Sequence, residues 1–214
     1  MSLDRPDFAL GRAAGRRPDT AEPQQQILGL AGGLSLAVAR LYAPRVVKLL
    51  IRGYVDIFRS IPLLVLLIVD YYALPFVGIR LSPFLSAVTA LSLVSAAYTA
   101  EIFRAGIEAI PNGQFEASAA LGLSNRHTMI DVILPQAIRV VIPPLTNNCI
   151  NVMKDTALAS VVAMPDLLKQ ATQAQALSAN PTPLIGAALI YIALLWPMVA
   201  IVGRLEKHFS RGTR

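Results

Sequence analysis

Charged residues are scarce in this chain, and so are the residue types on which most metal and catalytic sites depend. Asp, Glu, Lys and Arg make up 15% of its 214 residues and 55% are hydrophobic, whereas a soluble globular domain carries about 25% charge. One cysteine and two histidines are present, which excludes an internal disulfide and a cysteine-based zinc cluster. The composition disfavours a soluble or disordered chain and predicts one domain whose main solvent is a lipid bilayer.

Recognisable catalytic signatures are missing as well. The sequence has no HExxH, no GxSxG, no pair of carboxylates within a hydrophobic run and no phosphate-binding GxxxxGK[ST] loop. An intramembrane enzyme is therefore disfavoured. The formal net charge of +6 fits a membrane protein that keeps Lys and Arg in cytoplasmic loops. Nucleic-acid binding is disfavoured because no basic stripe with interleaved aromatic residues is present.

Four stretches are apolar over the roughly 20 residues that an α-helix needs to cross the hydrocarbon core. The stretch that begins near residue 60 contains one charged residue, Asp70. The stretch that begins near residue 132 also contains one charged residue, Arg139. We expect membrane spans near residues 60–79, 81–105, 132–153 and 184–203.

A fifth apolar stretch, residues 27–39, has only 13 residues before the next charge, which is about 20 Å of helix and too short to cross alone. We expect a shortened first helix over residues 27–43. The polar tail, residues 1–26, is expected to be disordered before about residue 22 because it is rich in Pro and charge. A second interpretation is a secretory signal with a small-residue cleavage site at Ala37-Val38-Ala39.

The positive charges orient these segments. Five Lys and Arg residues separate the first two apolar stretches, only Arg80 separates the second and third, and four more follow the last. Cytoplasmic loops carry the excess of Lys and Arg. The first loop, the loop after residue 104 and the C-terminal tail, residues 207–214, are therefore predicted to be cytoplasmic, and Arg80 is predicted to lie outside.

The long cytoplasmic loop, residues 101–135, is predicted to contain a short helix between two turns. Pro111-Asn112-Gly113 is a turn signal, and the Ala-rich stretch Phe115–Leu121 favours helix. Gly122 can end that helix in the left-handed conformation, and Ser124 can cap the helix that follows.

This short helix is expected to expose Ala117, Ala119 and Ala120, small residues that allow close contact with a partner surface. A helix resting on lipid headgroups is the alternative, but it would carry a Lys/Arg-rich polar face and large apolar anchors. In this stretch the acidic Glu116 precedes the small residues, and bulky apolar residues are few. A helix that docks on a protein is therefore favoured.

Ordered motifs occur along the chain. The longest motif begins with Glu116-Ala117-Ser118. Three residues later it has Gly122, and after nine more residues it ends with Val132-Ile133-Leu134-Pro135. This arrangement resembles the EAA loop of bacterial ABC importer permeases, whose pattern is Glu-Ala-Ala, three residues, Gly, nine residues, Ile, any residue, Leu-Pro. Ser118 replaces Ala and Val132 replaces Ile. Further segments resemble the polar amino-acid branch of that family: YVDIFRSIPLL at 54–64, AYTAEIFRAGI at 97–107, AIPNGQ at 109–114 and KDTALASVV at 154–162.

The resemblance implies an all-α membrane protein with the ABC importer permease fold, with about five transmembrane helices and a cytoplasmic coupling helix. The permease domain is expected at residues 27–206, with the EAA loop at 108–135. Members of the family begin with a full first helix, so the first helix here is expected to be shortened. The implied location is the bacterial inner membrane, which the chain crosses several times.

The resemblance also implies partners: a second permease subunit, identical or different, two ATP-binding subunits, an extracytoplasmic solute-binding protein and membrane lipid. The chain itself is expected to bind no cofactor, metal or nucleic acid and to carry no catalytic residue, because ATP is held by the partners. Closure of the ATPase pair is expected to move the docked helix and to switch the side to which the pore opens. The coupling residues are expected to be Glu116, Ala117, Ser118, Ala120, Leu121 and Gly122.

Polar residues at membrane depth are candidates for the substrate pathway. The set is Asn147, Asn148, Asn151, Lys154, Asp155 and Thr156. Asn147 and Asn151 are four residues apart and share a helix face. They can line a pathway for a zwitterion or form hydrogen bonds between helices. The Lys154–Asp155 pair can also be a local ionic tie at the outer surface.

Two further features complete the expectations from the sequence. Pro143-Pro144 is expected to break or kink the fourth span, and Glu101 is expected to pair with Arg104. The favoured function is an amino-acid importer permease that forms the translocation pathway. A transport-incompetent, truncated permease remnant and a membrane channel are the alternatives.

Overall fold

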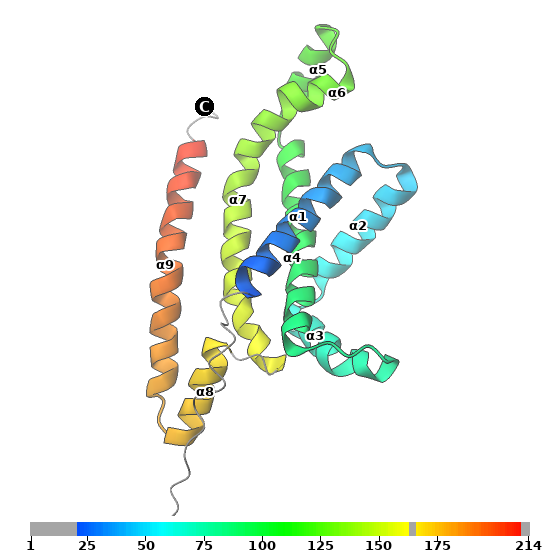
Figure 1. Cartoon of the computed structure of the whole chain (residues 1–214). Helices are drawn as coiled ribbons and strands as arrows, with labels where there is room; N and C mark the ends of the chain where they lie inside the picture. The colour runs from blue at the N-terminus through cyan, green and yellow to red at the C-terminus, as the bar shows by residue number, and fades with distance from the viewer. Residues whose placement is uncertain (1–20, 163–165, 211–214) are drawn as a thin grey trace, which may run out of the picture.

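The computed structural model describes residues 21–162 and 166–210, and all regular elements in these ranges are helices. The α-helices are α1 Ala21–Tyr42, α2 Arg45–Ser60, α3 Leu63–Ile68, α4 Pro83–Glu108, α5 Asn112–Ala120, α6 Asn125–His127, α7 Leu134–Asp155, α8 Leu167–Ser178 and α9 Thr182–Ser210. The π-helical turns η2 Val69–Ala73 and η4 Thr128–Ile133 and the 3-10 turns η3 Leu74–Val77 and η5 Thr156–Val162 lie between them. The expected all-helical fold is confirmed for this part of the chain, shown in Figure 1.

Three helical segments of the described chain are long and apolar enough to cross a membrane: 83–108, 125–162 and 182–204. A fourth span exists if the bent pair formed by residues 45–60 and 63–77 is counted as one, and residues 27–39 form a shorter apolar helix. This set agrees with the expectation of about five membrane helices. The first helix begins at Ala21, earlier than expected from the sequence, and residues 1–20, where disorder was expected, lie outside the described residues.

The span expected near residues 60–79 is helical over residues 63–77 and begins at a sharp bend. The chain breaks at Ile61 and Pro62, and the helical segments on either side are bent by 97° relative to each other. Ile61 is extended, with φ −80° and ψ 126°, because the residue before a proline is disfavoured in the helical region. Four of the five positive charges expected in a first loop lie instead on α2, which ends at this break, and the fifth, Arg40, lies in α1.

Glycines bring α1 against α4. A Cβ at Gly29 would lie 2.6 Å from the Ser95 side chain, and a Cβ at Gly33 would lie 2.4 Å from Thr99. Gly106 of α4 lies equally close to α7, where an added Cβ would be 2.3 Å from Val141 Cγ2. These contacts let the backbones approach closely, as small residues do in membrane helix pairs, and they make α4 the central helix.

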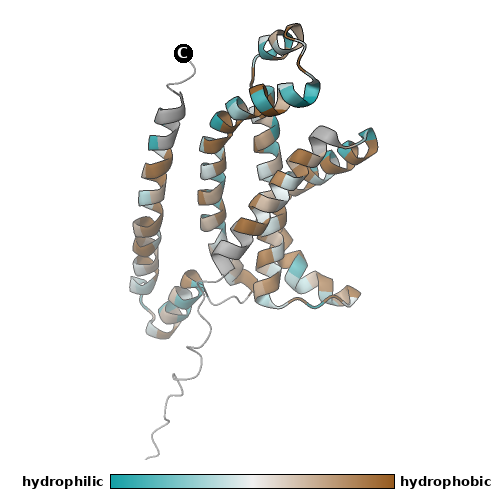
Figure 2. Ribbon diagram, turned by 45° about the horizontal axis from the view of Figure 1, so that its top comes forward, coloured by the Kyte–Doolittle hydropathy of each residue, from teal (hydrophilic) through white to brown (hydrophobic). Residues whose placement is uncertain are grey.

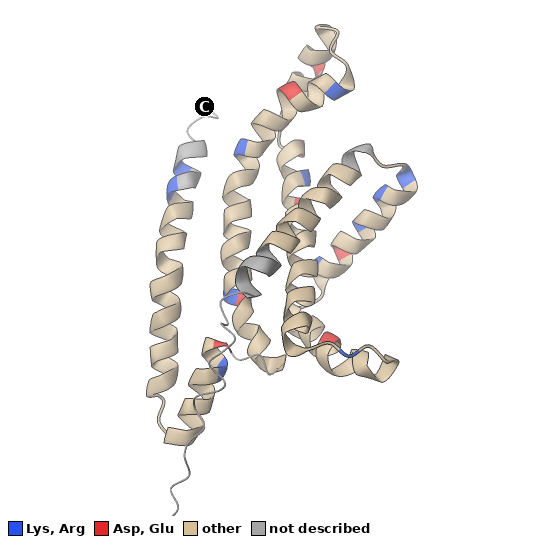
Figure 3. Ribbon diagram, viewed as in Figure 1, with Lys and Arg blue, Asp and Glu red and all other residues tan. Residues whose placement is uncertain are grey.

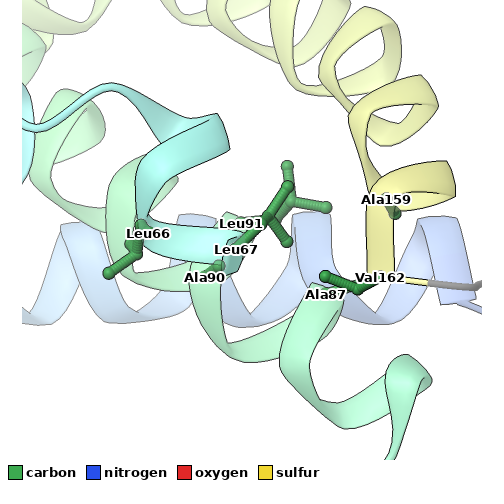
Figure 4. Close-up of a cluster of buried hydrophobic side chains, with 7 residues drawn as sticks. All are labelled: Leu66, Leu67, Ala87, Ala90, Leu91, Ala159 and Val162. Carbon is green, nitrogen blue, oxygen red and sulfur yellow. The ribbon is translucent and has the colours of Figure 1, made fainter. Parts of the chain in front are cut away.

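Buried apolar side chains join α3, α4 and η5 at the end of the molecule opposite α5. Figure 4 shows this cluster, which consists of Leu66, Leu67, Ala87, Ala90, Leu91, Ala159 and Val162. Leu67 and Val162 are fully buried. The cluster holds α3 against α4 and thereby fixes one wall of the cavity described below.

The two ends of the molecule differ in polarity. Figure 1 shows α5, α6 and the C-terminal end of α9 on the same side, with α3 and the α8–α9 turn on the other. In Figure 2 hydrophobic residues run along the length of α9, whereas hydrophilic residues gather around α5 and α6. The relative placement of the EAA loop and the end of α9 agrees with the expectation that both face the cytoplasm.

Candidate coupling loop and membrane cavity

The helix α5, where the sequence predicted a coupling helix, begins earlier than the sequence suggested. Pro111 is its N-cap residue, and Asn112 and Gly113 form its first turn rather than the expected separate turn. The Gln114 N–H donates to the Pro111 carbonyl at 3.0 Å. Glu116 therefore lies in the second turn of α5 and not at its N-terminus. Because the helix dipole acts mainly on the first and last turns, it contributes little to the effect of charge at Glu116.

The end of α5 is the left-handed turn that the sequence predicts. Gly122 has φ +72°. The Gly122 N–H donates to the Ala119 carbonyl at 3.0 Å, and the Leu123 N–H donates to the Ser118 carbonyl at 3.1 Å, the pair of bonds that defines a Schellman motif. Ser124 then caps α6, as expected, by accepting from the His127 N–H at 3.4 Å. Two successive caps thus set the direction in which α5 points.

One face of α5 is anchored to the membrane domain. Phe115 packs against the buried cluster of Ile110, Ile133 and Ala137. The Gln136 side-chain amide donates to Gln114 Oε1 at 3.2 Å. Ser118 is also buried, and its hydroxyl donates to the Gln114 carbonyl at 2.7 Å. Ser118 therefore contributes to the anchored face of the helix.

The other face of α5 is exposed to solvent. Most residues expected to couple lie on it or at its end: Glu116, Ala117, Ala120, Leu121 and Gly122, together with Ala119. Leu121 is 80% exposed. A surface of small side chains with one exposed leucine is suited to close contact with another protein, and it projects from the molecule in Figure 1.

A cavity of about 250 Å³ lies between α3, α4 and α7. Its α4 wall has the spacing of one helix face and consists of Leu91, Val94, Ser95 and Tyr98. Its α7 wall has the same spacing and consists of Asn148, Asn151, Val152 and Asp155, with Lys154 beside them and Leu63 of α3 completing the lining. The volume lies below the range of about 300–1,000 Å³ typical of drug-sized ligand pockets, so the cavity suits a small solute.

The structure brings four of the six candidate pathway residues to this cavity. Asn148, Asn151, Lys154 and Asp155 line it, whereas Asn147 and Thr156 do not. Asn147 is exposed, and the Thr156 hydroxyl donates to the Met153 carbonyl at 2.7 Å. The face shared by Asn147 and Asn151 is therefore not the face that lines the cavity. Pro143 and Pro144 do not break α7, which runs continuously through both.

Sequence reasoning missed the α4 side of the cavity. Ser95 and Tyr98 lie in an uncharged run whose small residues gave no polar signal. Their spacing relative to Leu91 and Val94, at i, i+3, i+4 and i+7, is the pattern that places side chains on one helix face. The sequence did not show which face of α4 met α7, because this depends on the close approach at Gly106.

An ionic cluster borders the cavity beyond Tyr98. Arg104 pairs with Glu101 at 2.6 Å, as expected, and also with Glu108. Arg59 of α2 pairs with Glu101 at 3.3 Å, and its guanidinium carbon lies 5.6 Å from the centre of the Tyr98 ring. The cluster ties α2 to α4, and Tyr98 joins it to the cavity wall. Among the described residues, no group of three or more His, Cys, Asp and Glu is arranged to hold a metal ion.

Comparison with known families settles the class of protein to which this helix bundle and projecting loop belong. The family described as binding-protein-dependent transport system inner membrane component matches residues 29–214. The chain belongs to this family. It is a permease subunit of an ABC importer, a non-catalytic component of the inner membrane, and its EAA loop is the segment that contains α5.

Curated relatives of this permease cover most of the chain. It is 36% identical over 190 residues to the probable glutamine ABC transporter permease protein GlnM of Bacillus subtilis, covering 86% of this chain and 88% of the relative. It is 37% identical to the L-cystine transport system permease protein TcyB of the same organism, covering 86% of this chain and 80% of the relative. It is 38% identical to the arginine transport system permease protein ArtQ of that organism, covering 86% and 85%.

Solved structures share the fold of this permease. A chain from a structure described as an amino acid ABC transporter with histidines has a TM-score of 0.84 and 33% identity, covering 89% of this chain and 90% of that chain. A chain from inward-facing MetNI methionine ABC transporter has a TM-score of 0.68 and 22% identity, covering 90% of each, which shows the shared fold.

Proposed function

We propose that this permease forms the translocation pathway of an importer for polar amino acids and that α5 couples this pathway to separate ATP-hydrolysing subunits. The observation that carries the proposal is the pairing of an anchored, projecting α5 with a polar-lined cavity in one small helical domain. The named relatives support the amino-acid class, because they are described as glutamine, cystine and arginine permeases.

The partners in this proposal are two ATP-binding subunits, a second permease subunit and an extracytoplasmic solute-binding protein. The exposed face of α5 is the contact for one ATP-binding subunit. Movement of that subunit reaches the membrane domain through Phe115, which packs against Ile133 near the start of α7. Since α7 also carries the polar wall of the cavity, one helix links the docking site to the pathway. A rigid element of this kind biases a bundle between two arrangements.

The cavity is proposed to hold the substrate during passage. The Lys154 ammonium group is placed to attract a carboxylate, and the Asp155 carboxylate to attract an amino group, the two charges that every zwitterionic amino acid carries. Asn148 and Asn151 supply side-chain amides that both donate and accept hydrogen bonds. Lys154, Asp155 and the two asparagines all line the cavity, so one small solute can contact several of them.

The remnant and the channel are not favoured, because the comparisons name permease proteins and ABC transporters. Uptake measurements test the assigned pathway. The chain is reconstituted with its ATP-binding and solute-binding partners, and ATP-driven uptake of glutamine, arginine and cystine is measured. Uptake of at least one is expected, and Asn151→Leu is expected to lower its rate about tenfold or more.

Asn147→Leu is the matched control, since it makes the same change on the same helix outside the cavity. It is expected to retain most of the uptake. Co-purification of the ATP-binding subunit checks that both variants still assemble. Equal uptake by the two variants would contradict the assigned pathway, and no ATP-driven uptake of any amino acid by the assembled wild type would contradict the proposed function.

A further inference from the structure

One side of α2 carries a row of cations. Successive residues of an α-helix are rotated by about 100° around its axis. Around the axis of α2, an arc of about 80° therefore contains four cationic residues and one acidic residue: Arg45, Lys48, Arg52, Arg59 and Asp56. The side chains of Arg45, Lys48 and Arg52 are all exposed. Arg52 also contacts Asp56 at 3.7 Å, in a pair that is itself open to solvent. We call Arg45, Lys48 and Arg52 the α2 cation row.

An apolar band lies directly beside this row. Its members are Val46, Leu49, Leu50 and Ile57, which are 71%, 70%, 68% and 55% exposed. The third side of α2 is anchored, because Ile51 and Val55 are buried with Ala100 of α4. The helix therefore presents a cationic strip and a hydrophobic strip side by side, on a backbone that the rest of the bundle holds in place.

The position of the α2 cation row fits a membrane surface. In Figure 1 the connection between α1 and α2 projects sideways from the bundle. Figure 3 shows Lys and Arg at the start of α2 and also near the end of α4, the start of α7 and the end of α9. These helix ends lie on the side of the molecule that carries α5. Cations on several helix ends on one side mark the boundary between hydrocarbon and cytoplasm.

We propose that the exposed side of α2 is a binding surface for anionic phospholipids of the cytoplasmic leaflet. The headgroup phosphates contact the α2 cation row, and the upper acyl chains cover the band formed by Val46, Leu49, Leu50 and Ile57. Long Arg and Lys side chains reach the headgroup region while their stems remain on apolar surface. Each cation near an anionic surface strengthens binding by about fivefold, equivalent to about 1 kcal/mol.

Charge complementarity favours lipid over a second copy of this chain. Outside α2, the exposed carboxylates among the described side chains are those of Glu108, Glu116 and Asp131. They lie at the end of α4 and around α5 and η4, where the chain leaves the hydrophobic bundle. At the depth of α2, the described part of a second copy therefore has no row of acidic residues next to an apolar band, and it cannot match both strips of α2. An anionic phospholipid carries both features in one molecule.

The experiment measures lipid selectivity at α2 within the assembled transporter. A fluorophore is attached at Val46→Cys in a Cys149→Ala background, and the complex is reconstituted in phosphatidylcholine. Quenching by brominated phosphatidylglycerol is compared with quenching by brominated phosphatidylcholine. We expect the anionic lipid to associate at least about threefold more strongly. This preference is expected to disappear near 1 M salt, where the screening length is about 3 Å.

Two triple variants separate the α2 cation row from charge in general. Arg45→Gln/Lys48→Gln/Arg52→Gln is expected to lower the preference to about one. Arg80→Gln/Arg126→Gln/Lys207→Gln removes the same charge from exposed positions elsewhere and is expected to leave the preference unchanged. Equal association of both lipids in the wild type, equal loss in both triple variants, or no quenching by either lipid would overturn the proposal. The last result would mean that protein covers this face. Co-purification of the ATP-binding subunit checks that each variant is assembled, and the result does not depend on uptake.

Discussion

Gly33 lets α1 lie against α4 at a distance that no side chain permits. An added Cβ would be 2.4 Å from Thr99 Cβ and 2.8 Å from the Ala96 carbonyl oxygen. The second contact is with backbone, so a rotamer change cannot relieve it. As a consequence, α1 and α4 form one closely packed pair. Adding a side chain at this contact is expected to lower the stability of the whole bundle.

Gly33→Ala is therefore expected to destabilise the protein by about 1–3 kcal/mol, the usual range for overpacking a well-packed core. Gly186→Ala in α9 is the control, because nothing lies within 4 Å of its added Cβ. Relief of the helix penalty of glycine is expected to make it neutral or stabilising by up to about 1 kcal/mol. Thermal unfolding of both variants in detergent measures the difference. A Gly33→Ala protein as stable as Gly186→Ala would show that the two helices are not held in this close contact.

Single residues differ in how well the sequence predicts them. Gly122 and Ser124 were predictable because the turn that each favours depends on local chemistry: a glycine tolerates φ +72° and a serine caps the following helix. The choice of Asn148 over Asn147 for the cavity was not predictable. It depends on the rotation of α7 against α4, which is set by contacts between residues far apart in the sequence.

The helix α5 has one face packed against the bundle and one face exposed to solvent. Phe115 faces the bundle and packs against Ile110 and Ile133, whereas Leu121 is 80% exposed at the end of the helix. Anchoring and the proposed docking are therefore assigned to different side chains. Truncating one or the other is expected to separate the two roles.

Phe115→Ala is expected to loosen α5 and to raise amide hydrogen exchange over residues 112–120 about tenfold, because the helix loses its main apolar contact. Leu121→Ala is expected to leave that exchange unchanged and to weaken binding of the ATP-binding subunit instead. Hydrogen exchange by mass spectrometry and a pull-down distinguish the outcomes. Increased exchange in Leu121→Ala, or none in Phe115→Ala, would reverse the assignment of the two faces.

The sequence predicted most elements by type and missed their boundaries for identifiable reasons. Spans 81–105 and 184–203 correspond to α4 and α9, because long apolar runs form helices wherever they cross a bilayer. The break at Pro62 was hidden within an apolar run that looked continuous. Asn112 and Gly113 resembled a turn, but Pro111 is the N-cap residue of α5 and they form its first turn. Proline is common both in turns and at the start of helices.

The whole molecule has two ends that are expected to face opposite sides of the membrane. The end of α9 and the helix α5 lie on one side, and the turn between α3 and α4 lies on the other (Figure 1). The Lys and Arg distribution places the first side in the cytoplasm. Phe76, which is 91% exposed next to that turn, should then face the outside.

In a Cys149→Ala background, Phe76→Cys is expected to react with an impermeant maleimide added to intact cells. Leu121→Cys and Lys207→Cys are expected to react only after the membrane is opened. Labelling of Leu121→Cys from outside would place α5 on the wrong side for contact with a cytoplasmic ATP-binding subunit. Equal labelling of Phe76→Cys and Lys207→Cys from one side would contradict the separation of the two ends.

In the proposed mechanism, α5 transmits ATP-driven movement to the transport pathway, and the direction of α5 depends on the left-handed turn at Gly122. Gly122→Val forces a β-branched side chain into φ +72°, whereas Gly113→Val lies in the same loop without positive φ, and neither added Cβ meets a neighbour within 4 Å. The unfavourable conformation costs of order 1 kcal/mol, and the larger effect is expected from the altered direction of α5.

The most direct measurement is the number of substrate molecules imported per ATP hydrolysed by reconstituted complexes. We expect Gly122→Val to insert in the membrane but to lower this ratio about tenfold or more, and Gly113→Val to change it much less. Glu116→Lys, which reverses a charge on the exposed face of α5, is expected to weaken assembly with the ATP-binding subunit. A wild-type ratio in the Gly122→Val/Glu116→Lys double variant would show that α5 is not the coupling element.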